Sequence, residues 1–299
     1  MATTVNPITQ FKPSDFEGIA LGKKLGAGTY GTVHVGLLKD GRYVAVKQLI
    51  MEDGEDSAAD NREIAVHSQL SHPNIIRYLH SSVDKTASPA QLNVYLEFVT
   101  GGSLTAIMKT LPGACLPRPV VKVYARHIFQ GLAYLHSQGF AHRDVKGDNV
   151  LISQDQGVAK LADFDQAKIV AASVTFRRQA ANNPMGNPST TLAGTPFWIA
   201  PEVITQEDGY DAFKADVWSG ACTIAEMVTG RAPWQPMSSP MGIMYKLANS
   251  EGWPDAIPST KAELGDDLLW DLLDKCFTRD AAARPSAADV LNHGYFQSA

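Results

Sequence analysis

The chain has 299 residues and a mass of 32.3 kDa, which is enough for about two domains or one unit of two lobes. Its 44% hydrophobic and 19% charged residues can supply a full core and exclude a wholly disordered chain. The net charge of -5 and the pI near 5.9 argue against a protein that binds nucleic acid through a basic face. No apolar run approaches the roughly 18 residues that a membrane helix needs.

Residues 1–10 contain neither a basic head nor an apolar stretch, so they do not resemble a signal peptide. The three cysteines, Cys115, Cys222 and Cys276, lie far apart in the chain and form no CxxC pair. They are typical of reduced thiols that fill a core. These features predict a cytoplasmic protein, with a nuclear location as the alternative, and no membrane or nucleic-acid partner.

The first hundred residues show mainly the two-residue alternation of strands. Residues 1–15 are expected to be an irregular leader, and the alternation over 19–50 is interrupted by a hairpin turn at 39–42. A helical stretch is expected to end near Leu70, before His72 and Pro73, and strands to resume at 75–79 and 92–99. This pattern predicts a mostly antiparallel sheet with one helix.

Beyond Gly102 the pattern becomes helical. Tyr124, Ile128, Leu132 and Leu135 fall on one stripe, while residues 217–228 are apolar nearly all round, as in a helix at the centre of a domain. Further helices are expected over 268–276 and 287–291. The predicted class is therefore α+β, with a small β-rich lobe over 16–99 and a larger, mostly helical lobe over 100–297.

Gly26, Gly28 and Gly31 form a GxGxxG pattern, which alone fits several phosphate-binding folds and many plain turns. A dinucleotide site would need a helix directly after these glycines. Here a strand and a hairpin follow instead. This order favours a glycine-tipped flap that covers phosphates with exposed backbone amides, and it argues against a dinucleotide oxidoreductase.

Two further groups of polar residues suit nucleotide chemistry. Lys47 lies on a predicted strand, where Glu63 of the following helix could pair with it. The short stretch 142–149 places Asp144, Lys146 and Asn149 on one side of a tight turn. Asp163 follows one strand hairpin later, and a carboxylate with an amide oxygen suits Mg²⁺.

These motifs stand in the order that is typical of eukaryotic protein kinases: the glycine loop, the strand lysine, the helix glutamate, 142–149, 163–165 and 200–202. The resemblance extends over about residues 16–296 and implies the bilobal kinase fold. Lys146, together with residues 194–198, is similar to Ser/Thr kinases rather than Tyr kinases. Residues 96–104 and 142–149 resemble the STE group, especially mitogen-activated protein kinase kinase kinases.

The resemblance implies ATP and Mg²⁺ as cofactors and protein serine or threonine as the acceptor. Asp144 would orient the substrate hydroxyl and accept its proton, and Lys146 would steady the γ-phosphate. Asn149 and Asp163 would hold Mg²⁺, while Lys47, held by Glu63, would bind the α- and β-phosphates.

Other residues are assigned to nucleotide binding or to support of the large lobe by the same resemblance. Glu202 and Arg284 would form a buried ion pair, and Asp216 would brace the catalytic turn. The nucleotide-binding set comprises the glycines Gly26, Gly28 and Gly31, the adenine contacts Leu25, Val33, Ala45 and Leu151, the gatekeeper Leu96, the hinge residues Glu97 and Val99, and Ser103.

The chain departs from the family at Asp165, where kinases have glycine after the Asp163-Phe164 pair. Three interpretations follow: an active kinase with a stiffened triplet, a pseudokinase that acts as a scaffold or allosteric partner, or an engineered or sequencing change. An active kinase is favoured because every residue assigned above to phosphate or metal chemistry is present.

The segment between Asp163 and Glu202 is about 40 residues long, unusual for a connection inside a domain. Thr191 matches the activating phosphorylation site of related kinases. A phosphate there could pair with Arg143 and order the loop. The alternative is that hydroxyl residues are simply common in loops. Phosphorylation of Thr191, if it regulates the chain, would come from an upstream kinase or from autophosphorylation.

Overall fold

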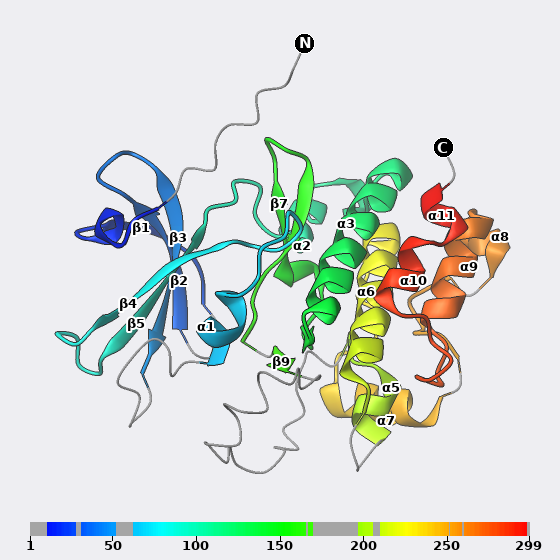
Figure 1. Cartoon of the computed structure of the whole chain (residues 1–299). Coiled ribbons are helices and arrows are strands. Elements are labelled where there is room, and N and C mark those ends of the chain that lie inside the picture. Colours follow the sequence, from blue (N-terminus) through cyan, green and yellow to red (C-terminus); the bar gives the residue numbers. More distant parts are fainter. Residues whose placement is uncertain are drawn as a thin grey trace. The chain divides into compact units, whose positions relative to one another are not determined.

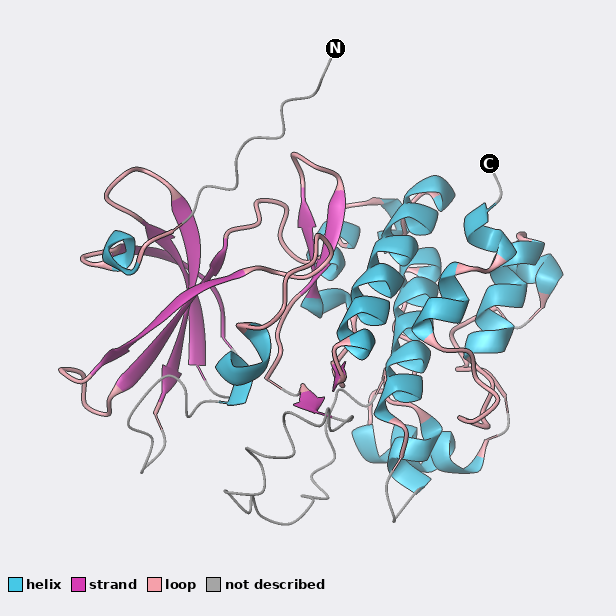
Figure 2. Cartoon of the chain, in the orientation of Figure 1, coloured by secondary structure: helices cyan, strands magenta, loops and turns pink. Residues whose placement is uncertain are grey.

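The computed structural model describes residues 11–27, 31–51, 62–165, 167–169, 197–205, 210–250, 252–258 and 260–297. These residues form two compact units. The first unit comprises the described residues up to Leu70 together with Arg77–Val99. The second comprises Ser71–Ile76 together with the described residues from Thr100 onward. An α+β class with a β-rich unit and a helical unit is thereby confirmed (Figure 2).

A five-stranded antiparallel sheet forms most of the first unit (Figure 1). Its strands lie in the order β1-β2-β3-β5-β4. The predicted hairpin turn is present, and Gly41 adopts a φ of 87°, which favours glycine. The bounds are β1 (Ala20–Ala27), β2 (Gly31–Leu37), β3 (Tyr43–Ile50), β4 (Tyr78–Asp84) and β5 (Gln91–Glu97).

The helix of the first unit, α1 (Arg62–His67), ends before the predicted Leu70. Its last residues tighten into a turn, because Leu70 N donates to His67 O at 3.1 Å rather than to the carbonyl four residues earlier. Leu70 remains buried and therefore still contributes to the core.

The N-terminal segment is more ordered than the predicted irregular leader. Pro13–Phe16 forms a short 3₁₀ helix, η1, and the Phe16 ring lies 4.5 Å from the ring of Tyr95. Asp15 binds Arg42 at 3.0 Å, beside the β2–β3 turn. Burial of Phe16, which is 4% exposed, supplies the driving force that composition alone does not reveal. Residues 1–10 lie outside the described part of the chain.

The second unit is built around two long helices, α3 (Arg118–Ser137) and α6 (Ala212–Thr229), which run side by side (Figure 1). Helix α6 is buried on nearly all sides, as its sequence predicts. Asp211 caps its first turn, and Gly230 ends it with a φ of 68°. The other helices are α2 (Leu104–Met108), α5 (Pro201–Thr205), α7 (Pro240–Asn249), α8 (Lys261–Leu264), α9 (Asp267–Cys276), α10 (Ala287–Leu291) and α11 (Gly294–Gln297).

Two pairs of short strands lie next to residues 142–149. β6 (Phe140–Ala141) pairs with β9 (Lys168–Ile169), and β7 (Val150–Ser153) pairs with β8 (Val158–Leu161). The turn η4 (Gly147–Asn149) lies directly before β7. In the described part of the chain, no helix is both long enough and apolar enough to cross a membrane.

Residues 75–79 were expected to begin a strand of the sheet, but β4 begins only at Tyr78. Ile75 and Ile76 pair instead with Leu161 of the second unit, where Ile76 N donates to Leu161 O at 2.9 Å. Asn74 anchors the same segment, since its Nδ2 donates to Ala159 O at 3.0 Å. Gly131 of α3 permits this approach, because a Cβ there would lie 2.8 Å from Asn74 O.

Candidate active site

The stretch 142–149 forms a tight turn between β6 and β7. Hydrogen bonds to α6 stabilise this turn. The buried carboxylate of Asp216 accepts hydrogen bonds from the backbone amides of His142 and Arg143, each at 2.8 Å. His136 lies 2.9 Å from the same carboxylate. Arg143 has a φ of 68°, a left-handed conformation that is uncommon outside glycine. These contacts fix a backbone shape that the turn would not adopt by itself.

Asp144, Lys146 and Asn149 meet on one side of this turn, as their spacing predicts. Lys146 Nζ donates to Asp144 Oδ2 at 2.7 Å, and Asn149 Nδ2 donates to the same oxygen at 2.8 Å. Asn149 Nδ2 also lies 2.8 Å from Asp144 O. The carboxylate is thus oriented by a cation and an amide, and a substrate hydroxyl placed against it would meet an aligned proton acceptor.

Asp163 follows β8 and is tied to the same turn through the backbone. Ala162 N donates to Asn149 O at 2.9 Å, and His142 Nε2 lies 3.0 Å from Ala162 O. The Phe164 ring is buried 5.1 Å from the ring of His142. Asp163 itself is exposed and has a φ of 64°. The backbone therefore turns Asp163 outward while Phe164 anchors the triplet in the core.

The donor chemistry of Asn149 and Asp163 fits a magnesium ion. Asn149 uses its amide nitrogen to bind Asp144, so its side-chain oxygen is the atom that can serve a metal. Asp163 offers an exposed carboxylate. Across the described residues, no group of three or more His, Cys, Asp or Glu side chains could hold a metal ion by itself. A site of two protein oxygens suits Mg²⁺, which usually completes its shell with water and substrate phosphates.

Asp165 does not strain the backbone of the triplet. The non-glycine residues with positive φ in the described part of the chain are Ala114, Arg143 and Asp163. Asp165 lies outside that region of φ, and the turn is closed by Ala167 N, which donates to Phe164 O at 3.0 Å. The position therefore tolerates a Cβ in this conformation.

Several residues assigned to nucleotide binding share one face of the first unit's sheet. Strand pairing places Val33 opposite Lys47 and Ala45 opposite Leu96. Because Ala45 and Lys47 are two residues apart on β3, their side chains point to the same side. Lys47 is buried on this face at 8% exposure. The sheet thus groups four of the predicted residues without any assumption about a ligand.

The other first-unit residues predicted to bind nucleotide lie outside these two residue pairs. Gly26 and Gly31 flank the glycine loop at the ends of β1 and β2, and a Cβ on Gly31 would lie 1.9 Å from Gln48 O, so only glycine fits there. Leu25 is 48% exposed. Glu97 accepts a hydrogen bond from Arg77 N at 2.7 Å, and Val99 is half-buried.

Three predicted positions cannot be compared with the structure. Gly28 and Thr191 lie outside the described residues. Glu63 lies within α1, but its side chain is outside the described set, so its pairing with Lys47 stays a prediction.

Ser103 and Leu151, the second-unit members of the nucleotide-binding set, are neighbours. They form an isolated backbone bridge, and Ser103 Oγ also caps α2 by accepting from Ala106 N at 3.2 Å. Leu151 is half-buried on β7, two residues after Asn149. The bridge therefore connects this pair directly to the turn that carries Asp144.

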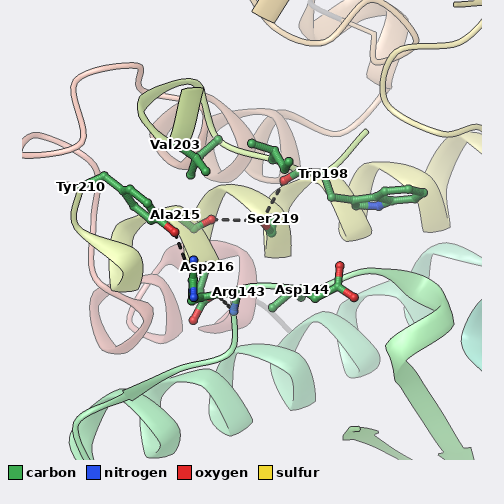
Figure 3. Close-up of a pocket in the computed structure, with 11 residues that line it drawn as sticks. Arg143, Asp144, Trp198, Val203, Tyr210, Ala215, Asp216 and Ser219 are labelled. Carbon is green, nitrogen blue, oxygen red and sulfur yellow. Dashed lines mark hydrogen bonds between the residues drawn. The ribbon is translucent and has the colours of Figure 1, made fainter. Parts of the chain in front are cut away.

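A small pocket lies beside the turn (Figure 3). The backbone of Arg143 binds Asp216, while its side-chain Nε donates to Tyr210 Oη at 3.1 Å. Val203 and Trp198 line the opposite wall. Tyr210 was not identified from the sequence, although an aromatic hydroxyl directly before the Asp211 cap was an available signal.

Two buried carboxyl groups of the second unit, those of Glu202 and Glu226, lie near the catalytic turn. Glu202 pairs with Arg284 at 2.6 and 3.0 Å, which confirms the predicted buried ion pair. Glu226 was missed, because the apolar character of α6 obscured the one acidic residue in its last two turns. Burial raises the pKa of Glu226 to about 7.

Comparisons with known proteins agree with this geometry. The protein kinase domain family matches residues 19–296. Mitogen-activated protein kinase kinase kinase 2 of Arabidopsis thaliana is 34% identical over 92% of this chain and 40% of its own length. Mitogen-activated protein kinase kinase kinase A of Dictyostelium discoideum is 36% identical over 93% and 28%. Mitogen-activated protein kinase kinase kinase 19 of Mus musculus is 35% identical over 92% and 20%.

The chain thus spans well under half the length of these relatives. The family match nevertheless includes the turn with Asp144, the strand lysine and the buried ion pair, and so covers every described element of the site. The chain belongs to the protein kinase domain family, and within it resembles the mitogen-activated protein kinase kinase kinases.

Proposed function

We propose that this chain is an ATP-dependent protein serine/threonine kinase. The observation that carries the proposal is the convergence of Lys146 and Asn149 on one oxygen of Asp144, at 2.7 and 2.8 Å. Phosphoryl transfer needs a positioned acceptor for the hydroxyl proton and a nearby cation for the developing phosphate charge. The same turn supplies both.

In the proposed reaction, Asp144 orients the hydroxyl of a substrate serine or threonine and accepts its proton. Lys146 lies beside that carboxylate and offsets negative charge on the γ-phosphoryl group during transfer. Asn149 and Asp163 would hold Mg²⁺, which supplies neutralisation of the phosphate oxygens when it is bound. Asp216 keeps the turn in its strained shape and so keeps Asp144 in place.

The nucleotide contacts proposed for the first unit follow from the shared sheet face. Lys47 would bind the α- and β-phosphates, with Glu63 as its partner. Val33 and Ala45 would contact the adenine ring. Gly31 lets β2 lie close to Gln48 of β3 beside the glycine loop, and the backbone amides of that loop would face the phosphates.

The relatives' printed names support a place in a mitogen-activated protein kinase cascade, with a protein as substrate. We further propose that phosphorylation of Thr191, by an upstream kinase or by the chain itself, draws the segment toward Arg143. A cytoplasmic location, with a nuclear one as the alternative, fits the composition. Asp165 prompted the pseudokinase alternative, but neither its backbone conformation nor any other described feature favours it.

An in vitro phosphorylation assay tests the proposal. The wild-type chain should transfer phosphate from ATP and Mg²⁺ to a generic basic protein, and Asp144→Asn should reduce transfer at least a hundredfold while remaining folded. A thermal shift with ATP should require Mg²⁺. Equal transfer by the two proteins would indicate a contaminating kinase, and absence of both transfer and Mg²⁺-dependent binding would support a scaffold.

A further inference from the structure

Strand β1 is irregular where it pairs with β2 around His34. Leu21 pairs with Gly36, but the next pair joins Lys24 to His34, so three steps along β1 match two steps along β2. This mismatch is a β-bulge, in which two residues of one strand oppose a single residue of the other. Gly22 therefore lies in the bulged stretch and not in a regular pair.

A second bulge follows directly and contains Leu25. Lys24 and Gly26 are two residues apart on β1, yet they pair with His34 and Val33, which are adjacent on β2. Leu25 is the extra residue, so Leu25 and Gly26 together oppose Val33. The second bulge thus brings Leu25 beside Val33, and both residues are among the adenine contacts that the kinase resemblance implies.

The half-buried imidazole of His34 connects β2 to the first bulge. Its Nδ1 lies 3.4 Å from Gly22 O, and its Nε2 lies 3.1 Å from Thr32 Oγ1. The tautomer with a proton on Nδ1 satisfies both contacts, because Nδ1 then donates to the carbonyl oxygen and Nε2 accepts from the hydroxyl group. One ring therefore links Gly22 of β1 to Thr32, the residue that follows Gly31 in β2.

The register of β1 is weakly specified by packing. β1 is the edge strand of the sheet, and all eight of its residues are exposed. A strand without a buried face can slip, and a slip by one residue moves each side chain to the opposite face of the sheet. A side-chain hydrogen bond from β2 to the bulge opposes such a slip.

We propose that His34 is a positioning residue for nucleotide binding, which fixes the register of β1 against β2 and thereby the place of Leu25 and Gly26. The inference rests on the nucleotide binding proposed above. His34 and Val33 are neighbours on a strand, so their side chains point to opposite faces of the sheet. The imidazole therefore acts through the backbone of β1 and not by contact with the nucleotide.

The affinity for MgATP, measured by isothermal titration calorimetry, tests this inference. His34→Leu removes both ring nitrogens and should raise the Kd for MgATP about fivefold, as expected for the loss of weak hydrogen bonds. Thr32→Val removes the hydroxyl group that orients the ring and should raise the Kd about threefold. The double variant should bind no more than about 1.5-fold more weakly than His34→Leu, because Thr32 acts through the imidazole.

Steady-state kinetics provide a readout that a loss of stability alone would not produce. KM for ATP should rise in parallel with the Kd, while kcat at saturating ATP and KM for the peptide should stay within about twofold of wild type. His34→Asn keeps an amide that can donate to Gly22 O and should restore the Kd to within about twofold of wild type.

His80→Leu is the matched control, because it removes a half-buried imidazole from β4 of the same sheet, where the ring packs against Phe16. It should leave the Kd for MgATP within about 1.5-fold of wild type. Thermal unfolding identifies any variant that fails to fold. His34→Val, which favours a strand, replaces His34→Leu if the latter does not fold.

Unchanged affinity for MgATP in folded His34→Leu would overturn the positioning role. An effect of Thr32→Val that is equally large with and without His34 would also overturn it. A wild-type chain that binds MgATP but transfers no phosphate would overturn the kinase activity, and the affinities would still decide the role of His34. A wild-type chain that binds no MgATP would overturn both.

Discussion

Arg284 donates from both terminal guanidinium nitrogens to the carboxylate of Glu202, at 2.6 and 3.0 Å, and both side chains are almost completely buried. The pair links α5 to the segment before α10, which lie far apart in the chain. A buried pair of this kind is costly to break, because removal of one partner leaves an uncompensated charge in the core.

We therefore expect Arg284→Ala to lower the free energy of unfolding of the second unit by about 3–5 kcal/mol. Denaturant unfolding followed by tryptophan fluorescence measures the change, since Trp218 lies 5.2 Å from the guanidinium. Arg231→Ala, at an exposed arginine after α6, is the matched control and should change it by less than about 0.5 kcal/mol. Similar losses of unfolding free energy for both variants would show that the buried pair stabilises the fold no more than an exposed arginine does.

Glu226→Gln should change how stability depends on pH. The ordinary pKa of this carboxyl group is 4.5, and the folded chain raises it to about 7. The unfolded chain therefore loses the proton first as pH rises, so stability falls between about pH 4.5 and 7 and stays lower above that range. The full penalty amounts to about 3 kcal/mol. Glu226→Gln avoids it and should gain in melting temperature relative to wild type at pH 8 but not at pH 4.5.

Asp216→Asn should impair turnover more than nucleotide binding. Asparagine offers one uncharged oxygen, so one of the backbone amides of His142 and Arg143 loses its acceptor and the other keeps only a neutral one. A hydrogen bond to a charged group contributes about 1.5–3 kcal/mol, so kcat should fall by about 10- to 100-fold. Asp211→Asn, at the cap of the same helix, should be nearly neutral, because asparagine caps as well as aspartate. Equal effects of the two substitutions would refute the bracing role.

Asp165→Gly should leave kinase activity within about threefold of wild type. The backbone at this position does not need a positive φ, so glycine relieves no strain and only adds freedom to the unfolded chain. The free energy of unfolding should fall by about 0.5–1 kcal/mol. Parallel activity and unfolding measurements check both expectations. A variant that acquires activity absent from the wild type would mean that Asp165 silences the enzyme.

Phe16→Ala should destabilise the first unit through its N-terminal segment. The ring is 4% exposed and packs against Tyr95 and His80, so its removal leaves a cavity. Loss of a buried phenylalanine costs about 3–5 kcal/mol. Tyr43→Ala, which removes an aromatic ring that is 58% exposed, should cost less than about 1 kcal/mol. Comparable melting temperatures for the two variants would show that the segment does not support the sheet.

Local patterns predicted much of the fold. Alternation over β2 and β3 gave the hairpin, and the apolar stripe of α3 gave a long helix whose buried residues include Ile128, Leu132 and Leu135. The grouping of Asp144, Lys146 and Asn149 also followed from spacing, because a tight turn brings residues two to five positions apart onto one side. These features depend on neighbours in the chain, which a single sequence contains.

Features that depend on distant partners were missed. Nothing near Phe16 indicates that Tyr95 will cover it, and nothing near Ile75 indicates that Leu161 will compete with the sheet for its backbone. The carboxyl group of Glu226 binds Trp198 and Thr105, and both lie far from it along the chain. The sequence held each of these residues, but their pairing is a property of the folded chain.

The anchoring of residues 71–76 through Asn74 limits how this protein can be divided. A cut after Val99 would yield a C-terminal fragment without the strip of backbone that Leu161 pairs with, and would leave the space above Gly131 uncovered. The helical half is therefore discontinuous along the polypeptide, and neither half is encoded by one uninterrupted stretch. Fragment complementation or domain exchange in this chain has to transfer the Asn74 segment along with the helices.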